Sequence, residues 1–183
     1  PSLQDALALA QVGDTIWVAA GTYYPDEGAG VTAGRQDTSF VLSDSVAVYG
    51  GFDGSETRLS ERDVEANRTI LSGDIDQDDS DPNGDGLIQT GDISGTNSYH
   101  VLRGPQAGGR IDGVIVTAGD ASGASSPQNL GGGVYITQQV GGDPALTVAH
   151  TRFVGNRALS SGGGIYVDNA DVLLSNAEFI GNE

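Results

Sequence analysis

The chain has 183 residues, 29 of them glycine, and contains no cysteine, so disulfides and thiolate metal sites are excluded. Eight basic residues, all arginine, against 25 acidic residues give a net charge of −17 at pH 7. This charge argues against nucleic acid and anionic membranes as partners and makes cations the natural counter-charge. The length fits a single domain, residues 1–183.

The first predicted element is a short amphipathic helix over residues 2–12, with Ser2 as its N-cap and Gly13 as its stop. A helix directly before the first β-rich segment is placed to cover the exposed end of a stacked β architecture. The residues that share its apolar face are Leu3, Ala6, Leu7 and Ala10.

Short runs of β-branched and aromatic residues follow, with no 3.6-residue period between them, which predicts strands joined by glycine turns. We expect three strands in each of about four coils, with loops 23–39, 52–68, 73–98 and 118–131 inserted at corners. The predicted strands are residues 14–19, 40–42 and 46–49 in the first coil, 70–72, 100–102 and 113–116 in the second, 134–136, 146–148 and 152–154 in the third, and 165–167, 172–174 and 178–180 in the fourth.

The repeat is clearest in the C-terminal third. Residues 131–136 (GGGVYI) return as residues 162–167 (GGGIYV), and residues 153–156 (FVGN) return as residues 179–182 (FIGN). Repeats of about 26 to 31 residues with two β-rich runs and a glycine turn are typical of a solenoid. We therefore expect Val134, Tyr135 or Ile136 to stack on Ile165, Tyr166 or Val167 in parallel strands. We expect the asparagines that end the second motif to stack as a short amide ladder.

These motifs resemble the GG-aliphatic and F-x-x-N repeats of chlamydial polymorphic outer-membrane proteins. Similar repeats occur in secreted bacterial right-handed β-helix proteins of the pectate-lyase-like class. Residues 13–26 (GDTIWVAAGTYYPD), 48–63 (VYGGFDGSETRLSERD) and 69–76 (TILSGDID) look like the opening coils of those secreted proteins. The resemblance implies an all-β, right-handed parallel β-helix, and a fold of this kind does not fix the activity.

One loop, inside the acidic insert 73–98, has the ligand spacing of an EF-hand calcium loop. Alternating oxygen side chains can point at a hard cation, Gly86 allows a sharp reversal, and Leu87 can offer its carbonyl. The sequence therefore predicts Ca²⁺ as a cofactor. The predicted ligands are Asp81, Asn83, Asp85, Leu87 and Asp92.

Asp at the last position of this loop is also found in bacterial dockerin modules, which the stretch resembles. Neither flank predicts a helix, so we expect a helix-less calcium loop and no cohesin partner. Upstream, Asp74, Asp76, Asp78 and Asp79 complete this shell or form a second site. The alternative is a solvated acidic loop without a bound ion.

The sequence offers little for catalysis. Polysaccharide lyases share the implied fold and need a basic residue to abstract a proton. Arg58, Arg62 and Arg68 are expected to pair with nearby acids, while His100 and His150 have no partner in sequence. We therefore expect a non-catalytic, calcium-stabilised structural or adhesive module; the alternatives are a polysaccharide lyase or a carbohydrate-binding module for acidic glycans.

The resemblance places the protein outside the cell, as a secreted or cell-surface bacterial protein, with glycans among its candidate partners. No apolar run is long enough to cross a bilayer, so no direct membrane insertion is expected. The sequence stops after a repeat motif, at Glu183, so we expect a piece of a longer protein. Either further chain or other subunits would cover the open C-terminal coil.

Overall fold

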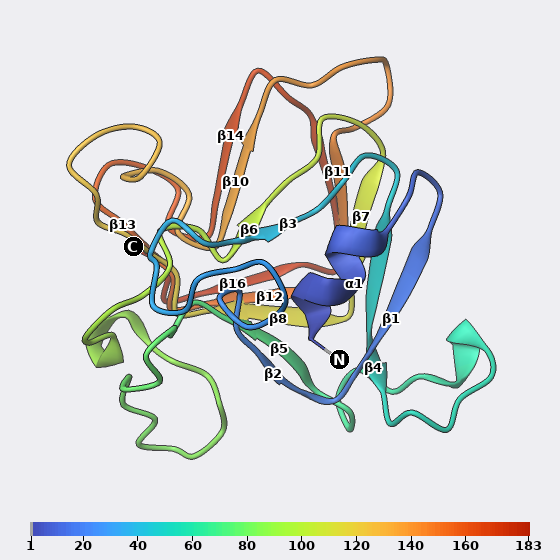
Figure 1. Cartoon of the computed structure of the whole chain (residues 1–183), viewed down its shortest axis with the longest axis horizontal. Helices are drawn as coiled ribbons and strands as arrows, with labels where there is room; N and C mark the ends of the chain where they lie inside the picture. The colour runs from blue at the N-terminus through green and yellow to red at the C-terminus, as the bar shows by residue number, and fades with distance from the viewer. Residues whose placement is uncertain (1) are drawn as a thin grey trace.

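The computed structural model describes residues 2–183 and is all-β, with one short α-helix at the N-terminal end. Within this range, every ladder between named strands is parallel. The strands form three larger sheets, here called sheets A, B and C, and one two-stranded sheet. In Figure 1, the three larger sheets surround a common interior like the sides of a triangle.

Helix α1 (Leu3–Leu9) covers the N-terminal end of that interior (Figure 1). Ser2 caps it as predicted, because its Oγ accepts from the backbone N–H of Asp5, whose carboxylate accepts from the N–H of Ser2 in return. The helix ends at Leu9 with Ala10 as its C-cap, earlier than the predicted stop at Gly13. Leu3 and Leu7 are buried in the main core, which confirms the predicted apolar face.

Sheet A has the strand order β1-β4-β7-β11-β15. Its strands are β1 (Thr15–Ala19), β4 (Ala47–Phe52), β7 (Gly109–Asp112), β11 (Leu146–Ala149) and β15 (Val172–Ser175). Sequence alone missed β7, because one aliphatic residue between a glycine, an arginine and an aspartate does not predict a strand.

Sheet B has the order β2-β5-β8-β12-β16. Its strands are β2 (Gly21–Tyr23), β5 (Thr69–Ser72), β8 (Val114–Thr117), β12 (Arg152–Val154) and β16 (Glu178–Ile180). Strand β2 was not predicted from the sequence. The chain bends at Ala20 after β1, and Gly21 begins β2 by pairing with Thr69, with a φ of 149° that favours glycine.

Sheet C consists of β3 (Phe40–Val41), β6 (Leu102–Arg103), β10 (Val134–Thr137) and β14 (Ile165–Asp168). The predicted stacking of the glycine repeats is confirmed, since Val134 pairs with Ile165 and Tyr135 with Tyr166. The remaining strands, β9 (Asp120–Ala121) and β13 (Arg157–Ala158), form the two-stranded sheet. Strand β9 lies inside residues 118–131, which were predicted to be loop only.

The chain visits the sheets in a fixed order, A then B then C, from β1 to the last strand. Because sheets A and B each hold five strands, the predicted grouping into about four coils is wrong for the first half of the chain. The missed strands β2 and β7 explain this error: without them, residues 46–49 were placed in the first coil, whereas they open the second circuit.

The main core lies between the three sheets. Along each strand, side chains that point into this core alternate with side chains that point outward. Val48, Ile111 and Val148 come from sheet A, Phe153 from sheet B and Phe40 from sheet C, and all are at most 2% exposed. This alternation gives each strand one inward position for every outward one.

A second apolar cluster lies outside sheet B, where Leu87 of the insert packs with Ile70, Ile115 and Val154. The backbone next to it is also tied down, since Thr117 Oγ1 donates to the carbonyl of Ile88 over 3.0 Å. The acidic insert is therefore anchored to the outer face of sheet B rather than projecting freely. Short 3₁₀ turns occur at η1 (Leu59–Glu61) and, inside the insert, η2 (Thr90–Asp92).

The predicted asparagine ladder is confirmed. Asn156 donates to Asn182 Oδ1 from its side-chain Nδ2 at 3.0 Å and from its backbone N–H at 3.1 Å, and Asn182 Nδ2 donates to the carbonyl of Phe153 at 2.8 Å. Phe153 and Phe179 stack in the same pair of strands, with ring centroids 4.8 Å apart. Like residues thus lie on like residues along the last two circuits.

Candidate functional site

The acidic insert, residues 73–98, begins and ends at two segments that lie side by side and are hydrogen-bonded to each other. We call this pair of segments the neck. Asp74 and Asn97 form an antiparallel bridge, and the backbone N–H of Ser98 donates to the carbonyl of Gly73 over 2.7 Å. A positive φ of 56° at Gln77 turns the chain back directly after the neck. The aspartates that flank this turn are consequently brought close together in space.

Asp74, Asp76 and Asp78 form the acidic cluster of this region, and we call them the aspartate triad. Each offers one carboxylate oxygen, and these oxygens all lie within 4.8 Å of one another. Asp74 is buried, whereas Asp76 and Asp78 are exposed. Such an arrangement leaves one side of the triad open to solvent and therefore accessible to an ion.

The triad fits a calcium ion in size and in donor chemistry. Calcium binds oxygen ligands at about 2.3–2.6 Å, so two ligands of one ion lie at most roughly 5 Å apart. Gly95 supports the fit, because a Cβ added there would collide with the carboxylates of Asp76 and Asp78. The backbone N–H of Thr96 donates to Asp76 Oδ2 at 2.8 Å and orients that carboxylate.

The electrostatics of the neck also favour a cation. Burial raises the pKa of Asp74, and the negative charges of Asp76 and Asp78 raise it further. Burial likewise raises the pKa of neighbouring Asp79 to about 6, against hydrogen bonds from Ser94 and Asn97 that lower it. A bound cation would compensate the ionised carboxylates that the protein itself leaves poorly compensated.

Asn97 contributes a further polar atom at the neck. It is 1% exposed, and its Nδ2 donates to Asp79 Oδ2 at 2.7 Å and to the carbonyl of Ala118 at 2.9 Å. Its Oδ1 is buried and has no hydrogen-bond partner among residues 2–183. Buried polar atoms are rarely left unpaired, which makes this amide oxygen a candidate position for a bound water or ion.

The EF-hand-like residues of the same insert lie apart from the triad's group of oxygens. Asp81 accepts from the backbone N–H groups of Asp85 and Gly86, so its carboxylate holds its own loop together. Asp85 accepts in the same way from Leu87, whose side chain packs on sheet B. Within residues 2–183, the converging acidic group does not include Asp81, Asp85 or Asp92.

Asn83 is exposed, and Asp92 lies in η2, where its carbonyl accepts from the backbone N–H of Ser80. Calcium ligation by the EF-hand-like set, the five predicted ligands from Asp81 to Asp92, therefore stays a prediction. Of the four upstream aspartates, which were expected either to complete that shell or to form a second site, the structure brings Asp74, Asp76 and Asp78 together, and Asp79 is not in this group.

A second polar cluster, which sequence reasoning missed, surrounds Asp112 at the end of β7. This aspartate is 2% exposed and accepts from Arg110 at 2.6 Å and from Arg62 in the 52–68 insert. His150 Nδ1 lies 3.1 Å from the same carboxylate. Burial opposes ionisation, but the hydrogen bonds from Arg62, Arg110 and His150 outweigh it and hold the pKa of Asp112 below its ordinary value.

The expected pairing of Arg62 with nearby acids of its own loop is corrected by this cluster, since its partner comes from β7. No partner was predicted for His150, which lies between Asp112 and Asn176, with Asn176 Nδ2 3.1 Å from its Nε2. An amide donor at Nε2 and a carboxylate at Nδ1 occupy both ring nitrogens, so His150 links successive circuits of the chain rather than presenting a free base.

Beside His150 lies an open cleft of about 320 Å³, whose wall includes Arg152, Asn176 and Glu178. Arg68 lines a small void next to it, and its Nε and Nη2 atoms are buried without a hydrogen-bond partner in the described part of the chain. Unpaired guanidinium donors favour an anionic partner. This is the feature of the structure that suits an acidic ligand.

No family model, curated protein or solved structure matches this chain. The resemblances to polymorphic outer-membrane proteins, pectate-lyase-like proteins and dockerin loops therefore stay predictions. Among the described residues, no helix has both the length and the apolar character needed to cross a membrane.

Proposed function

We propose that the protein is a right-handed parallel β-helix serving as a non-catalytic, calcium-stabilised structural or adhesive module of a secreted or cell-surface bacterial protein. The repeated passage through sheets A, B and C supports the solenoid, because each circuit adds one parallel strand to each face. Like-on-like stacking of Phe153 on Phe179 and of Asn156 on Asn182 supports it further.

The aspartate triad is the single observation that carries the calcium part of the proposal. Three carboxylates within 4.8 Å repel one another unless a cation neutralises them. Calcium binding would stabilise the folded state by about 3 kcal/mol at a hundredfold excess over Kd. The residues that bind the ion would be Asp74, Asp76 and Asp78, all on one side of the neck, and the ion would fix Asp76 where it accepts from the backbone N–H of Thr96 on the other side.

Isothermal titration calorimetry with calcium tests this proposal and separates the two predicted ligand sets. Asp76→Asn should weaken calcium binding at least tenfold if the triad is the site, while Asp85→Asn should do so if the EF-hand-like loop is the site. Asp143→Asn, on an exposed loop remote from the insert, is the matched charge control. No calcium binding by the unmodified protein at millimolar concentration would refute both.

The role of the ion can be read by hydrogen exchange after chelation. We expect residues 73–80 and 93–98 to lose protection first, because the neck depends on the triad. The segment around Leu87 should keep more protection, since it is anchored on sheet B through apolar contacts. Uniform loss of protection throughout sheets A, B and C would contradict this order.

A second candidate function is binding of acidic glycans at the cleft beside His150. The unpaired Arg68 donors favour it, and the adjacent Arg152, which pairs with Glu178 at 3.2 Å, adds a second guanidinium to the wall. Retention of the protein on an immobilised uronate oligomer, reduced by Arg152→Gln and unaffected by Arg35→Gln, would support this candidate. Release of unsaturated product from the same oligomer with calcium present would instead establish a polysaccharide lyase.

A further inference from the structure

Strand β3 is the terminal strand of sheet C, and its outer edge has backbone groups that no neighbouring strand covers. Phe40 and Leu42 direct their N–H groups toward the β6 segment, to the carbonyls of Val101 at 2.9 Å and Arg103 at 3.0 Å. In a parallel ladder, alternate residues face the same neighbour, so Val41 directs its N–H and C=O away from β6. Val41 is also 55% exposed.

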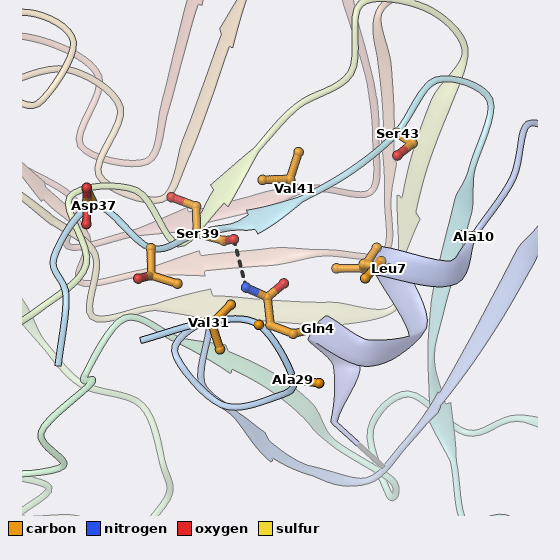
Figure 2. Close-up of a pocket in the computed structure, with 12 residues that line it drawn as sticks. Gln4, Leu7, Ala10, Ala29, Val31, Asp37, Ser39, Val41 and Ser43 are labelled. Atoms are coloured by element: carbon orange, nitrogen blue, oxygen red, sulfur yellow. Dashed lines mark hydrogen bonds between the residues drawn. The ribbon is translucent and has the colours of Figure 1, made fainter. Parts of the chain in front are cut away.

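A cleft of about 540 Å³ lies along this edge, between β3 and helix α1 (Figure 2). One wall presents Ser39, Val41 and Ser43, the alternate residues of an extended segment. The opposite wall includes Leu7 and Ala8 of α1, and the loop at Ala29–Val31 closes one end. The cleft therefore combines an apolar wall with a row of backbone groups at strand spacing.

Gln4 already makes the kind of contact that an added strand would make. Its Nε2 donates to the carbonyl of Ser39 at 3.0 Å, drawn as the dashed line in Figure 2, and also to the carbonyl of Pro25. The side-chain amide stands where the N–H of a neighbouring strand would lie. Beyond it, the outward N–H and C=O of Val41 continue the same edge.

We propose that this cleft binds an extended, cationic polypeptide segment of a partner protein, which adds to β3 as a further strand of sheet C. Exposed strand edges accept extended peptides through main-chain hydrogen bonds, and adjoining pockets select alternate side chains. The net charge of −17 favours a cationic partner. Of the acidic residues, Asp37 lines the cleft, in an exposed ion pair with Arg35, and Asp5 lies behind the lining residue Ala29, from whose N–H it accepts.

Ser39 strengthens the argument from the wall of the cleft. It is 5% exposed, and its Oγ is buried without a hydrogen-bond partner in the described range. A peptide in the cleft would reach this hydroxyl after a rotation of the Ser39 side chain, and its backbone has donors and acceptors that could then pair with it. A purely apolar occupant would leave this group and the Val41 backbone unpaired, at a cost that disfavours it.

The test is binding of the full chain to an array of hexapeptides that alternate Lys with Val, Thr, Ile or Tyr. The strongest binder is then compared with the same peptide N-methylated at alternate residues, which removes the N–H groups that pair with β3. Loss of one backbone hydrogen bond should weaken binding about fivefold, and loss of two or three correspondingly more. Hydrogen exchange at the Val41 amide should slow when the unmodified peptide binds.

Two variants locate the binding surface. Ala8→Gln places a longer neutral side chain in the cleft from an exposed helix position and should weaken binding at least tenfold. Leu9→Gln, on the same helix but 81% exposed and outside the cleft, is the matched control and should bind normally. Equal binding of the N-methylated peptide, no binding by any array member, or saturable binding of a neutral oligosaccharide that displaces the peptide would overturn the proposal.

Discussion

The last circuits, residues 131–183, and the insert-bearing part, residues 14–130, build the same three sheets in different ways. In the last circuits, two aromatic residues meet their own kind, since Tyr135 stacks on Tyr166 and Phe153 on Phe179. In the earlier part, strand partners mostly differ, as Trp17 and Tyr49 do, although Ile70 pairs with Ile115. The sheets therefore require parallel register and an inward apolar position, whereas repetition of sequence is optional.

The earlier part compensates for its irregular sequence with polar and apolar contacts between distant segments. Arg62 reaches from the 52–68 insert to Asp112 on β7, and Leu87 carries the acidic insert onto sheet B. Long inserts at corners cost little, because the entropy of closing a loop rises only slowly with its length. Sheets A, B and C can thus keep their order while the connections between them vary.

The largest expected effect is in the repetitive part. Phe153→Ala should lower the free energy of unfolding by about 4 kcal/mol, because this side chain is fully buried and its removal leaves a cavity. Phe179→Ala removes the ring stacked on it but is 46% exposed, so the loss should be at most about half as large. Urea denaturation measures both, and equal losses would show that the last circuit is as well packed as the one before it.

Prediction from the sequence succeeded for the strands of sheets A, B and C in the last circuits and missed strands in the insert-bearing part. The triple-glycine repeats predicted the pairing of β10 with β14, because two copies of one pattern must occupy equivalent positions. Strand β7 has Ile111 as its one aliphatic residue, and its outward Arg110 and Asp112 belong to an ion-pair cluster made by tertiary contacts. No local pattern predicts such a strand, because its register comes from β4 and β11 on either side.

The candidate metal site was predictable in composition but not in detail. The density of aspartates pointed to the insert, and Asp74, Asp76 and Asp78 were named as a second set. Their convergence depends on the positive φ of Gln77 and on the bridge from Asp74 to Asn97, neither of which has a sequence signal. The EF-hand-like spacing instead describes a loop whose carboxylates accept from its own backbone, as at Asp81.

Removing the charge of Asp112 from the polar cluster around it should reduce stability nearly as much as removing the buried ring of Phe153. Asp112→Asn should destabilise the protein by about 3 kcal/mol, because Arg62 would lose its buried ionic partner. Asp37→Asn, in an exposed pair with Arg35, should cost less than about 1 kcal/mol. Thermal unfolding of both variants at pH 7 tests whether the irregular part depends on this contact, and a cost at Asp112 no larger than at Asp37 would show that it does not.

The contribution of Asp112 and its partners to the stability of the fold depends on pH in a defined direction. The folded pKa of Asp112 is lowered, so its contribution is complete above the ordinary value of about 4 and is lost as the pH falls through the folded value. The difference in stability between the unmodified protein and Asp112→Asn should therefore shrink below about pH 4. A difference that stayed constant down to pH 2 would contradict the assignment.

The asparagine ladder should contribute less to the free energy of unfolding than either Phe153 or Asp112. Asn156→Ala removes a fully buried amide that donates to Val116 and accepts from Gly119, and should cost about 2 kcal/mol. Asn182→Ala, one circuit later and only partly buried, should cost about half as much. Denaturant midpoints distinguish the two, and a larger loss at Asn182 would mean that the ladder is stabilised from the terminal circuit inward.

The smallest expected effect on stability is that of Asp79, which lies in the acidic insert and outside the repeats. Its folded pKa of about 6 lies above the ordinary value of about 4, so the folded state favours the protonated form. Its contribution to stability is complete below pH 4 and is lost as the pH rises through 6. In calcium-free buffer this loss should be about 1 kcal/mol, after allowance for solvent screening of a half-buried group.

Asp79→Asn isolates this contribution, since the variant cannot ionise at that position. Buried His100, whose pKa is lowered by burial, acts in the opposite direction over the same range but is present in both proteins and cancels in their difference. Thermal midpoints at pH 5 and pH 7 should therefore show the unmodified protein losing stability relative to Asp79→Asn at the higher pH. Saturating calcium should reduce this difference, because a cation at the adjacent triad stabilises the ionised carboxylate. A difference unaffected by both pH and calcium would show that the neck is open to water and that burial does not control the charge of its aspartates.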